Sequence, residues 1–139
     1  MEQLFSLANA AALTGWVALL AVPRWRVANW WYAGLAVPAA LAAAYVVLLA
    51  VHAPGAEGGF SSLAAVAALF RTEGVLLAGW VHYLAFDLFI GAWICRRAAK
   101  DGLSPWLARL CLPPTFLAGP AGLLLFLGLR AALVREIRP

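Results

Sequence analysis

Charged residues are scarce in this sequence, and their scarcity excludes a soluble globular domain. Of the 139 residues, 10 are Lys or Arg and 6 are Asp or Glu, while 65% are hydrophobic and the mean hydropathy is +0.90. A soluble protein of this length needs a polar exterior that this composition does not supply. We therefore expect the lipid bilayer to be the solvent of a single transmembrane helical domain that comprises residues 1–139.

Cysteine is also scarce, and the motifs of several enzyme classes are missing. The two cysteines, Cys95 and Cys111, stand at neither CxxC nor metal-knuckle spacing, so the sequence predicts no disulfide framework and no zinc site. A Walker loop, a dinucleotide fingerprint, a GxSxG elbow and a zincin signature are all absent from the sequence. Because little polar surface is available to a water-soluble cofactor, we expect no cofactor and no bound metal.

The excess of positive charge, a net +4 with a pI near 9.7, fits membrane topology better than nucleic-acid binding. The arginines stand at the ends of apolar runs, without the interleaved basic and aromatic residues of a nucleic-acid surface. If the N-terminus is outside, the positive-inside rule places the cations of the first and third connections in the cytoplasm. These cations are Arg24, Arg26, Arg96, Arg97 and Lys100. With four crossings Arg130, Arg135 and Arg138 would lie outside, so either the last region re-enters the membrane or the rule is overridden.

Apolar runs of about 20 residues, the length that crosses the hydrocarbon core, follow one another along the chain. The first three runs are Leu4–Val22, Trp31–Val51 and Gly74–Ile94. Pro38 is expected to kink the second. The last region, Pro105–Leu133, is too long for one straight crossing and too short for two. Because Pro113-Pro114 and Gly119-Pro120 interrupt it, we expect one broken or strongly kinked helix whose break faces the bundle interior.

A shorter apolar segment, Phe60–Phe70, follows the breaker-rich loop Ala53–Gly59 and is too short to cross. With Ser61 or Ser62 as its cap, we expect a short helix at the membrane interface. The predicted fold is therefore all-α: a polytopic membrane bundle of about four transmembrane helices, one short interfacial helix and a kinked last helix. The first apolar run lacks the basic region and cleavage site of a signal peptide, so we expect it to be retained. Abundant Ala, Leu, Gly and Arg favour a bacterial protein of the inner membrane.

One acidic residue, Asp87, lies in the middle of the third apolar run. A charge at this depth costs on the order of 3 kcal/mol, so such residues usually face the bundle interior and have a partner. On a helix Tyr83 shares the face of Asp87, whereas His82 stands about 140° round the axis. A carboxylic acid, a phenol and an imidazole are groups that perform general acid–base catalysis, and we predict these three residues as catalytic. The alternative is that Asp87 is a hydrogen-bond anchor between helices.

Aromatic residues of the apolar runs are predicted to line a pocket for a long apolar ligand. They are Trp16, Trp80, Phe86 and Trp93. Anchoring in lipid or at the interface is the alternative role for each. His52 ends the second run and is predicted to be an interfacial histidine. A metal or haem site formed by His52 and His82 is a weaker hypothesis, because no EXXH or HXXXH pattern accompanies the pair.

The run Leu77–Ile94, which contains WVHYLAFDLFIGAWI, resembles the abscisic-acid-deficient-4-like membrane family. Shorter matches at Phe60–Leu63 and Pro113–Leu124 extend the resemblance over most of the chain. The family includes a plant protein associated with neoxanthin synthesis and many bacterial members. For the plant member the resemblance implies conversion of violaxanthin into neoxanthin, in which an epoxide opens and an allene forms without net redox. Such a step needs an acid at the epoxide oxygen and a base at the neighbouring carbon, which are roles that the three predicted catalytic residues fit.

The buried acid and the resemblance together support two functional hypotheses. The leading one is a protein that binds a carotenoid or related isoprenoid lipid in a bundle cavity and isomerises it without a cofactor. The alternative is a non-enzymatic accessory protein that binds or stabilises a partner membrane enzyme through close helix packing at small residues. The residues expected to allow such packing are Gly79, Gly91, Gly119 and Gly122.

Overall fold

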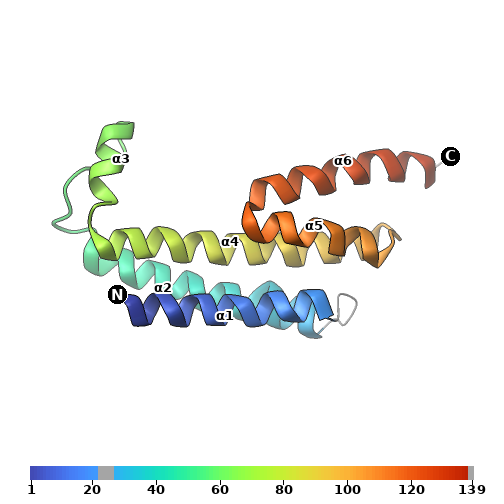
Figure 1. The fold of residues 1–139 in the computed structure, drawn as a ribbon, viewed down its shortest axis with the longest axis horizontal. Helices are drawn as coiled ribbons and strands as arrows, with labels where there is room; N and C mark the ends of the chain where they lie inside the picture. The colour runs from blue at the N-terminus through green and yellow to red at the C-terminus, as the bar shows by residue number, and fades with distance from the viewer. Residues whose placement is uncertain (22–26, 138–139) are drawn as a thin grey trace.

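Helices form where the sequence is apolar and free of chain breakers. The computed structural model describes residues 1–21 and 27–137, and every regular element among them is a helix (Figure 1). Their bounds are α1 Glu2–Ala21, η1 Val27–Ala36, α2 Val37–His52, α3 Leu63–Leu69, α4 Glu73–Lys100, α5 Pro105–Leu117 and α6 Gly119–Ile137. The all-α prediction is confirmed for these residues.

Three helical segments are long and apolar enough to cross a membrane, and they correspond to the first three predicted spans. They cover Glu2–Ala21, Asn29–His52 and Glu73–Lys100, with hydropathies of 1.7, 2.3 and 1.6. The third, α4, is the central helix, because it packs against α1, η1, α2, α5 and α6. Helices of this length and composition are compatible with a membrane protein.

The second span changes its helix type near Pro38, the residue that is expected to kink it. Val27–Ala36 is π-helical, and the α-helix begins at Val37, so Pro38 stands in the first turn of α2. A proline is tolerated there because the first N–H groups of an α-helix have no partner within that helix. Together the π-helical and α-helical parts form one continuous apolar segment.

The short helix α3 lies at one end of the bundle and is shorter than the predicted Phe60–Phe70. It begins after Ser62, whose Oγ accepts a hydrogen bond from the backbone N–H of Ala65 at 3.1 Å. In Figure 1 α3 stands across the long axis of the bundle. Phe60 and Leu63 leave 82% and 86% of their surface exposed at this end. Exposed apolar side chains on a helix in this orientation fit the predicted place at a membrane interface.

The last region is broken at the predicted place, but α5 and α6 are two helices packed against each other as a hairpin and not one kinked helix (Figure 1). The helical conformation ends at Ala118, which is extended at φ −158° and ψ 87°. Pro120 lacks the N–H that would bond to the carbonyl of Phe116 in a continuous helix, so the break has a covalent cause. The hairpin turns against the middle of α4, and α6 then runs back toward the end at which α5 began.

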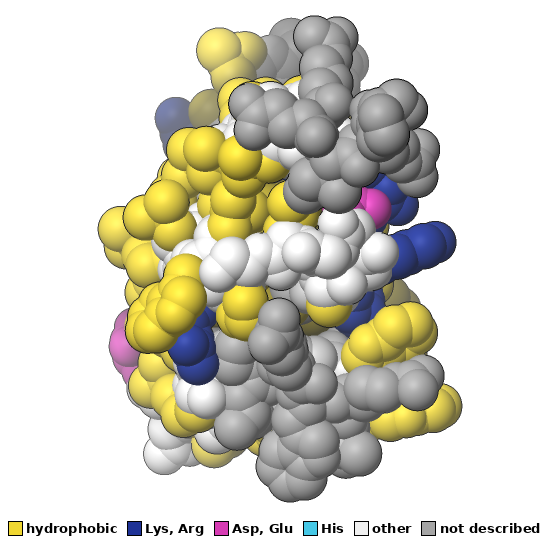
Figure 2. Space-filling model, turned by 90° about the vertical axis from the view of Figure 1, so that its right-hand side faces the viewer, with side chains coloured by type: hydrophobic (Ala, Val, Ile, Leu, Met, Phe, Trp, Pro, Cys, Tyr) yellow, Lys and Arg dark blue, Asp and Glu magenta, His cyan; other side chains and the backbone are white. Residues whose placement is uncertain are grey.

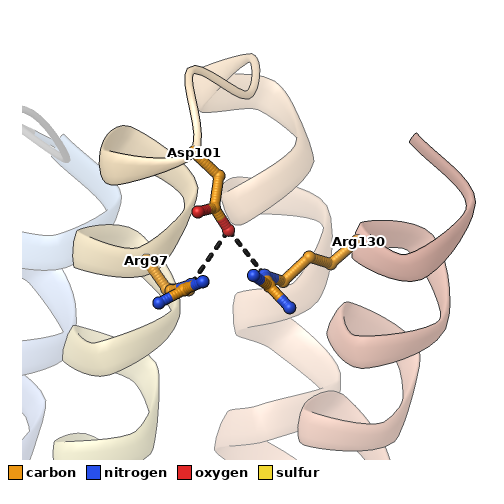
Figure 3. Close-up of polar contacts among 3 residues, drawn as sticks. All are labelled: Arg97, Asp101 and Arg130. Carbon is orange, nitrogen blue, oxygen red and sulfur yellow. Dashed lines mark hydrogen bonds and ion pairs between the residues drawn. The ribbon is translucent and has the colours of Figure 1, made fainter. Parts of the chain in front are cut away.

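An ion-pair cluster fastens the base of this hairpin to α4. Asp101 Oδ2 accepts hydrogen bonds from Arg130 Nε of α6 at 2.5 Å and from Arg97 Nε of α4 at 2.9 Å (Figure 3). The hydrogen bond from Arg130, together with that from Arg97, holds the pKa of the Asp101 carboxyl below its usual value. The C-terminal Arg130 is therefore at the same end of the bundle as the predicted cytoplasmic Arg97.

Other cations gather at this end as well, as the end-on view in Figure 2 shows. The Nε of Arg109 donates to the carbonyl of Leu20 at 3.2 Å, which joins α5 to the C-terminus of α1. The predicted cytoplasmic residues Arg24 and Arg26, and the C-terminal Arg138, lie outside the described residues.

Candidate functional site

The carboxyl of Asp87 lies in the middle of α4, beneath the turn between α5 and α6. The residue is 7% exposed, and within the described part of the chain its Oδ2 is buried with no hydrogen-bond partner. The carboxyl interacts with the backbone N–H of Gly119 at the first turn of α6. A Cβ placed on Gly119 would collide with Asp87 Oδ1, so this contact requires glycine. The N-terminus of a helix carries a partial positive charge, which suits an adjacent carboxylate.

The phenol of Tyr83 lies one helical turn before Asp87 and contacts the same chain break. Its hydroxyl donates to the carbonyl of Leu117 at 2.7 Å, with the carbonyl of Phe116 at 3.4 Å. These carbonyls belong to the last turn of α5, where helical donors are missing because the helix ends. The Tyr83 hydroxyl also interacts with the Asp87 carboxyl. The structure therefore brings two of the three predicted catalytic residues together.

A cavity of about 360 Å³ lies between α1, α4 and the end of α5. It is lined by Asn9, Ala12, Leu13, Trp80, Tyr83, Leu84, Phe116 and Leu117. Asp87 is not part of this lining, because it lies behind Tyr83 and under the hairpin turn. Tyr83 is thus the group that faces both the cavity and the buried carboxyl.

A second cavity, of about 410 Å³, continues the first toward the N-terminal end of α1. Trp80 lines both, and the second cavity also reaches Glu2 and Glu73 at its outer end. The indole Nε1 of Trp80 donates to Asn9 Oδ1 at 3.2 Å, which fixes the ring between the two spaces. Ten residues separate Glu73 from Tyr83, so the groove formed by both cavities extends about 15 Å along α4.

The other predicted pocket residues lie elsewhere. Trp16 is 3% exposed and packs edge-on against Phe116, with ring centroids 5.4 Å apart. Trp93 packs in the same manner against Phe126, at 5.7 Å. Phe86 is 56% exposed and belongs to the opposite side of α4. Of the four predicted pocket residues, the structure places Trp80 in the groove beside Tyr83.

The two histidines occupy separate places. His82 is exposed, and its ring stacks on Phe86 at 4.6 Å and lies 5.4 Å from the ring of Tyr45 in α2. His52 packs against Gly74, where a Cβ would collide with the imidazole. Gly74 and His82 are about 12 Å apart along α4, so the structure does not bring the histidines together. Across residues 1–21 and 27–137 there is no group of three or more metal-binding side chains.

Two residues of the site were not predicted as such. Gly119 contributes its N–H and the space for Asp87, although the sequence marks it as part of a helix breaker. Asn9 holds Trp80 at the groove. The signal in each case is a polar or breaking residue within an apolar run, and such residues tend to face protein and not lipid.

Comparison with known proteins gives one match. A family model described as ABA DEFICIENT 4-like matches residues 3–126, which extend from α1 into α6 and include Tyr83, Asp87 and Gly119. No curated protein and no solved structure matches the chain.

Proposed function

Because the chain belongs to the ABA DEFICIENT 4-like family, we propose that it is a membrane protein that binds a carotenoid or related isoprenoid lipid and isomerises it. The observation that carries the proposal is the position of Tyr83, which lines the cavity between α1 and α4 and contacts the buried carboxyl of Asp87. Ionisable groups at this depth of an apolar helix are functional by default.

The shape of the groove suits a long, apolar ligand. Its walls are mostly apolar side chains of α1 and α4, and its inner end is marked by the Tyr83 hydroxyl. Ligand sites generally combine an apolar lining with a few placed polar groups. An isoprenoid chain would lie along the groove, with its oxygen-bearing end at Tyr83.

The pair can supply the proton transfers of an isomerisation. When an epoxide opens to an alkene or allene, the oxygen gains a proton as its C–O bond breaks. A neighbouring carbon loses a proton, and the electron pair of that C–H bond forms the new double bond. In our proposal Tyr83 gives the proton to oxygen, Asp87 resupplies Tyr83, and the proton released from carbon returns to the pair. The substrate is neither oxidised nor reduced overall, and the proposed step uses no cofactor.

The proposed placement in the membrane has three crossings and a re-entrant hairpin. α1, η1 with α2, and α4 cross, while α5 and α6 enter from the end that carries Arg97 and Arg130 and turn back at the middle of α4. The positive-inside rule supports a cytoplasmic location for this end. The membrane that we propose is a bacterial inner membrane. Re-entrant backbone is tolerated at such depth when protein groups satisfy it, as Tyr83 and Asp87 do here.

Pigment analysis tests the function directly. The protein and its Asp87→Asn variant are produced in a carotenoid-synthesising host, and bound and total pigments are compared by chromatography. His82→Gln is the matched control, because it changes a neighbouring titratable residue on another face of α4. We expect the wild type and His82→Gln to yield the same converted pigment and Asp87→Asn to leave the precursor. Identical pigments in all three strains, with no isoprenoid bound to any protein, would refute the proposal.

The alternative, an accessory protein that packs against a partner enzyme, depends on small residues that are open to another helix. In the structure the four predicted glycines accept side chains of this same chain. Gly79 is covered by Phe70, Gly91 by Trp16, Gly119 by Asp87 and Gly122 by Thr115. The geometry therefore supports the ligand-binding proposal better than the accessory role.

A further inference from the structure

A separate apolar groove lies on the side of α4 that faces the second span. It has a volume of about 280 Å³ between η1, α2 and α4. Its floor is made of small residues, among them Gly34, Ala42 and Ala85. Its walls include Phe86 and Phe89, which are 56% and 43% exposed. The groove is open to the surroundings of the bundle.

The guanidinium of Arg96 lies against two residues that line this groove. It lies 5.6 Å from the ring centroid of Phe89, a groove residue, and 5.6 Å from that of Trp30. A Cβ on Gly34, another groove residue, would collide with Arg96 Nη1. Nη1 donates to the carbonyl of Asn29 at 3.4 Å, which is a long hydrogen bond. The two rings and the carbonyl hold the guanidinium in place.

Arg96 differs from its neighbours in the partners it has. Arg97 and Arg130 share the carboxylate of Asp101, and Arg109 donates to main-chain carbonyls at the end of α1. Among the side chains that the structure describes, those of residues 1–21 and 29–134, no carboxylate pairs with Arg96. A fixed, partly buried cation without a counter-charge attracts an anion from outside the chain.

We propose that this groove binds an anionic phospholipid, with the phosphate on Arg96 and one acyl chain along Ala42, Phe86 and Phe89. The site combines a cation with an adjacent apolar groove. A phospholipid has the complementary parts, an anionic phosphate joined to a hydrocarbon chain. The planar guanidinium can bond two phosphate oxygens at once. The site lies at the end of the bundle that gathers Lys and Arg, which selects an anionic lipid of the cytoplasmic leaflet.

Lipid retention by the purified full-length protein tests the site. The protein is mixed with dioleoylphosphatidylglycerol or dioleoylphosphatidylcholine, which have the same chains, and bound lipid is counted by native mass spectrometry. We expect phosphatidylglycerol to be retained over phosphatidylcholine. Arg96→Gln lowers its retention about fivefold, the contribution of one basic residue near a membrane surface. Lys100→Gln, which removes the same charge one turn further along α4, leaves retention unchanged.

Filling the groove tests the acyl-chain half of the site. Ala42→Phe places a ring in the groove, and Ala43→Phe adds the same ring at an adjacent exposed position outside it. We expect Ala42→Phe to reduce retention of phosphatidylglycerol while Ala43→Phe does not. If Arg96→Gln does not fold, Arg96→Lys keeps the charge but loses the planar fork, and it should still bind less phosphatidylglycerol than wild type.

Three results would overturn the inference. Equal retention of the two lipids by wild type would exclude selection of the anion. An equal loss in Lys100→Gln and Arg96→Gln would show a diffuse basic surface and not a site. Protection against thermal unfolding by inorganic phosphate that equals protection by phosphatidylglycerol would assign the anion site to free phosphate and leave the groove without a role.

Discussion

Two aspartates contact the α5–α6 hairpin, Asp87 of α4 at its tip and Asp101, directly after α4, at its base, and their partners differ. Asp101 meets two arginines at the end of the bundle. Asp87 meets no cation in the described chain; its contacts are a backbone N–H and a phenol, and one of its oxygens is unpartnered. A carboxylate that is paired with two arginines is sufficient to hold two helices together. A buried carboxyl with an unpartnered oxygen lowers the stability of the fold, so a purely structural role does not explain it. Such a group is instead typical of a functional site.

Changing each aspartate to asparagine should have the largest effects and should separate the roles of the two residues. We expect Asp87→Asn to lower pigment conversion at least about 100-fold, the usual contribution of a general acid or base. The unfolding temperature should stay near that of wild type, because the amide oxygen of asparagine can still accept from the backbone N–H of Gly119. Asp101→Asn should do the reverse and lower stability with conversion retained. The measurements are product yield in cells and thermal unfolding of the purified proteins. If both variants lose conversion and stability together, the two aspartates act alike and the contrast is wrong.

A methyl group at the tip should have the next largest effect. Gly119→Ala puts its Cβ against Asp87 Oδ1, and overpacking of this kind costs about 1–3 kcal/mol. Gly128→Ala is the matched control on α6, because nothing lies within 4 Å of its Cβ position. Unfolding curves of the two variants give the difference. Adding Asp87→Ala to Gly119→Ala removes the colliding atoms. The double variant should therefore lose less unfolding free energy than the two single variants lose together.

Removal of the Tyr83 hydroxyl should have a smaller effect on stability. Tyr83→Phe leaves the carbonyl of Leu117 without its donor, which costs about 1 kcal/mol. Because this hydroxyl also faces the cavity, conversion should fall as it does in Asp87→Asn. The control is Tyr45→Phe, which removes a phenol hydroxyl from α2, on the side where His82 lies. Conversion by this variant should match that of wild type. A Tyr83→Phe variant with full conversion would remove Tyr83 from the proposed proton path.

The sequence predicts local features of this molecule well, because they depend on periodicity and composition. The three long spans follow from apolar length, and the i, i+4 spacing that places Tyr83 beside Asp87 follows from helix geometry. The same geometry indicates that His82 points away, and its neighbour Tyr45 confirms the separation.

The sequence leaves the re-entry of the last region as one of two alternatives, because a helix breaker fixes where a helix stops and not where the chain goes next. Gly119-Pro120 marks the break, but the return of α6 depends on contacts with Asp87 and Asp101 from a distant part of the sequence. The positions of the aromatic residues also depend on contacts between distant parts of the sequence. Trp16 and Trp80 are both tryptophans of apolar runs, and packing alone makes one a core residue and the other a wall of the groove.

Loss of the Asp101 ion pairs at the base of the hairpin should have the smallest effect on stability. The pH dependence of unfolding measures this effect. Hydrogen bonds from Arg130 and Arg97 lower the folded-state pKa of Asp101, so the stabilisation is present above the unfolded value of about 3.9 and is lost as pH falls through the folded value. The two arginines of this part-buried cluster remain about a third exposed, so the cluster contributes about 1 kcal/mol or less. Between pH 5 and pH 3 wild type should therefore lose more stability than Asp101→Asn, and high salt should narrow the gap. Parallel pH profiles for the two proteins would mean that Asp101 does not hold the hairpin. In that case the contacts of Asp87 and Tyr83 at the tip of the hairpin would alone fix the position of α6.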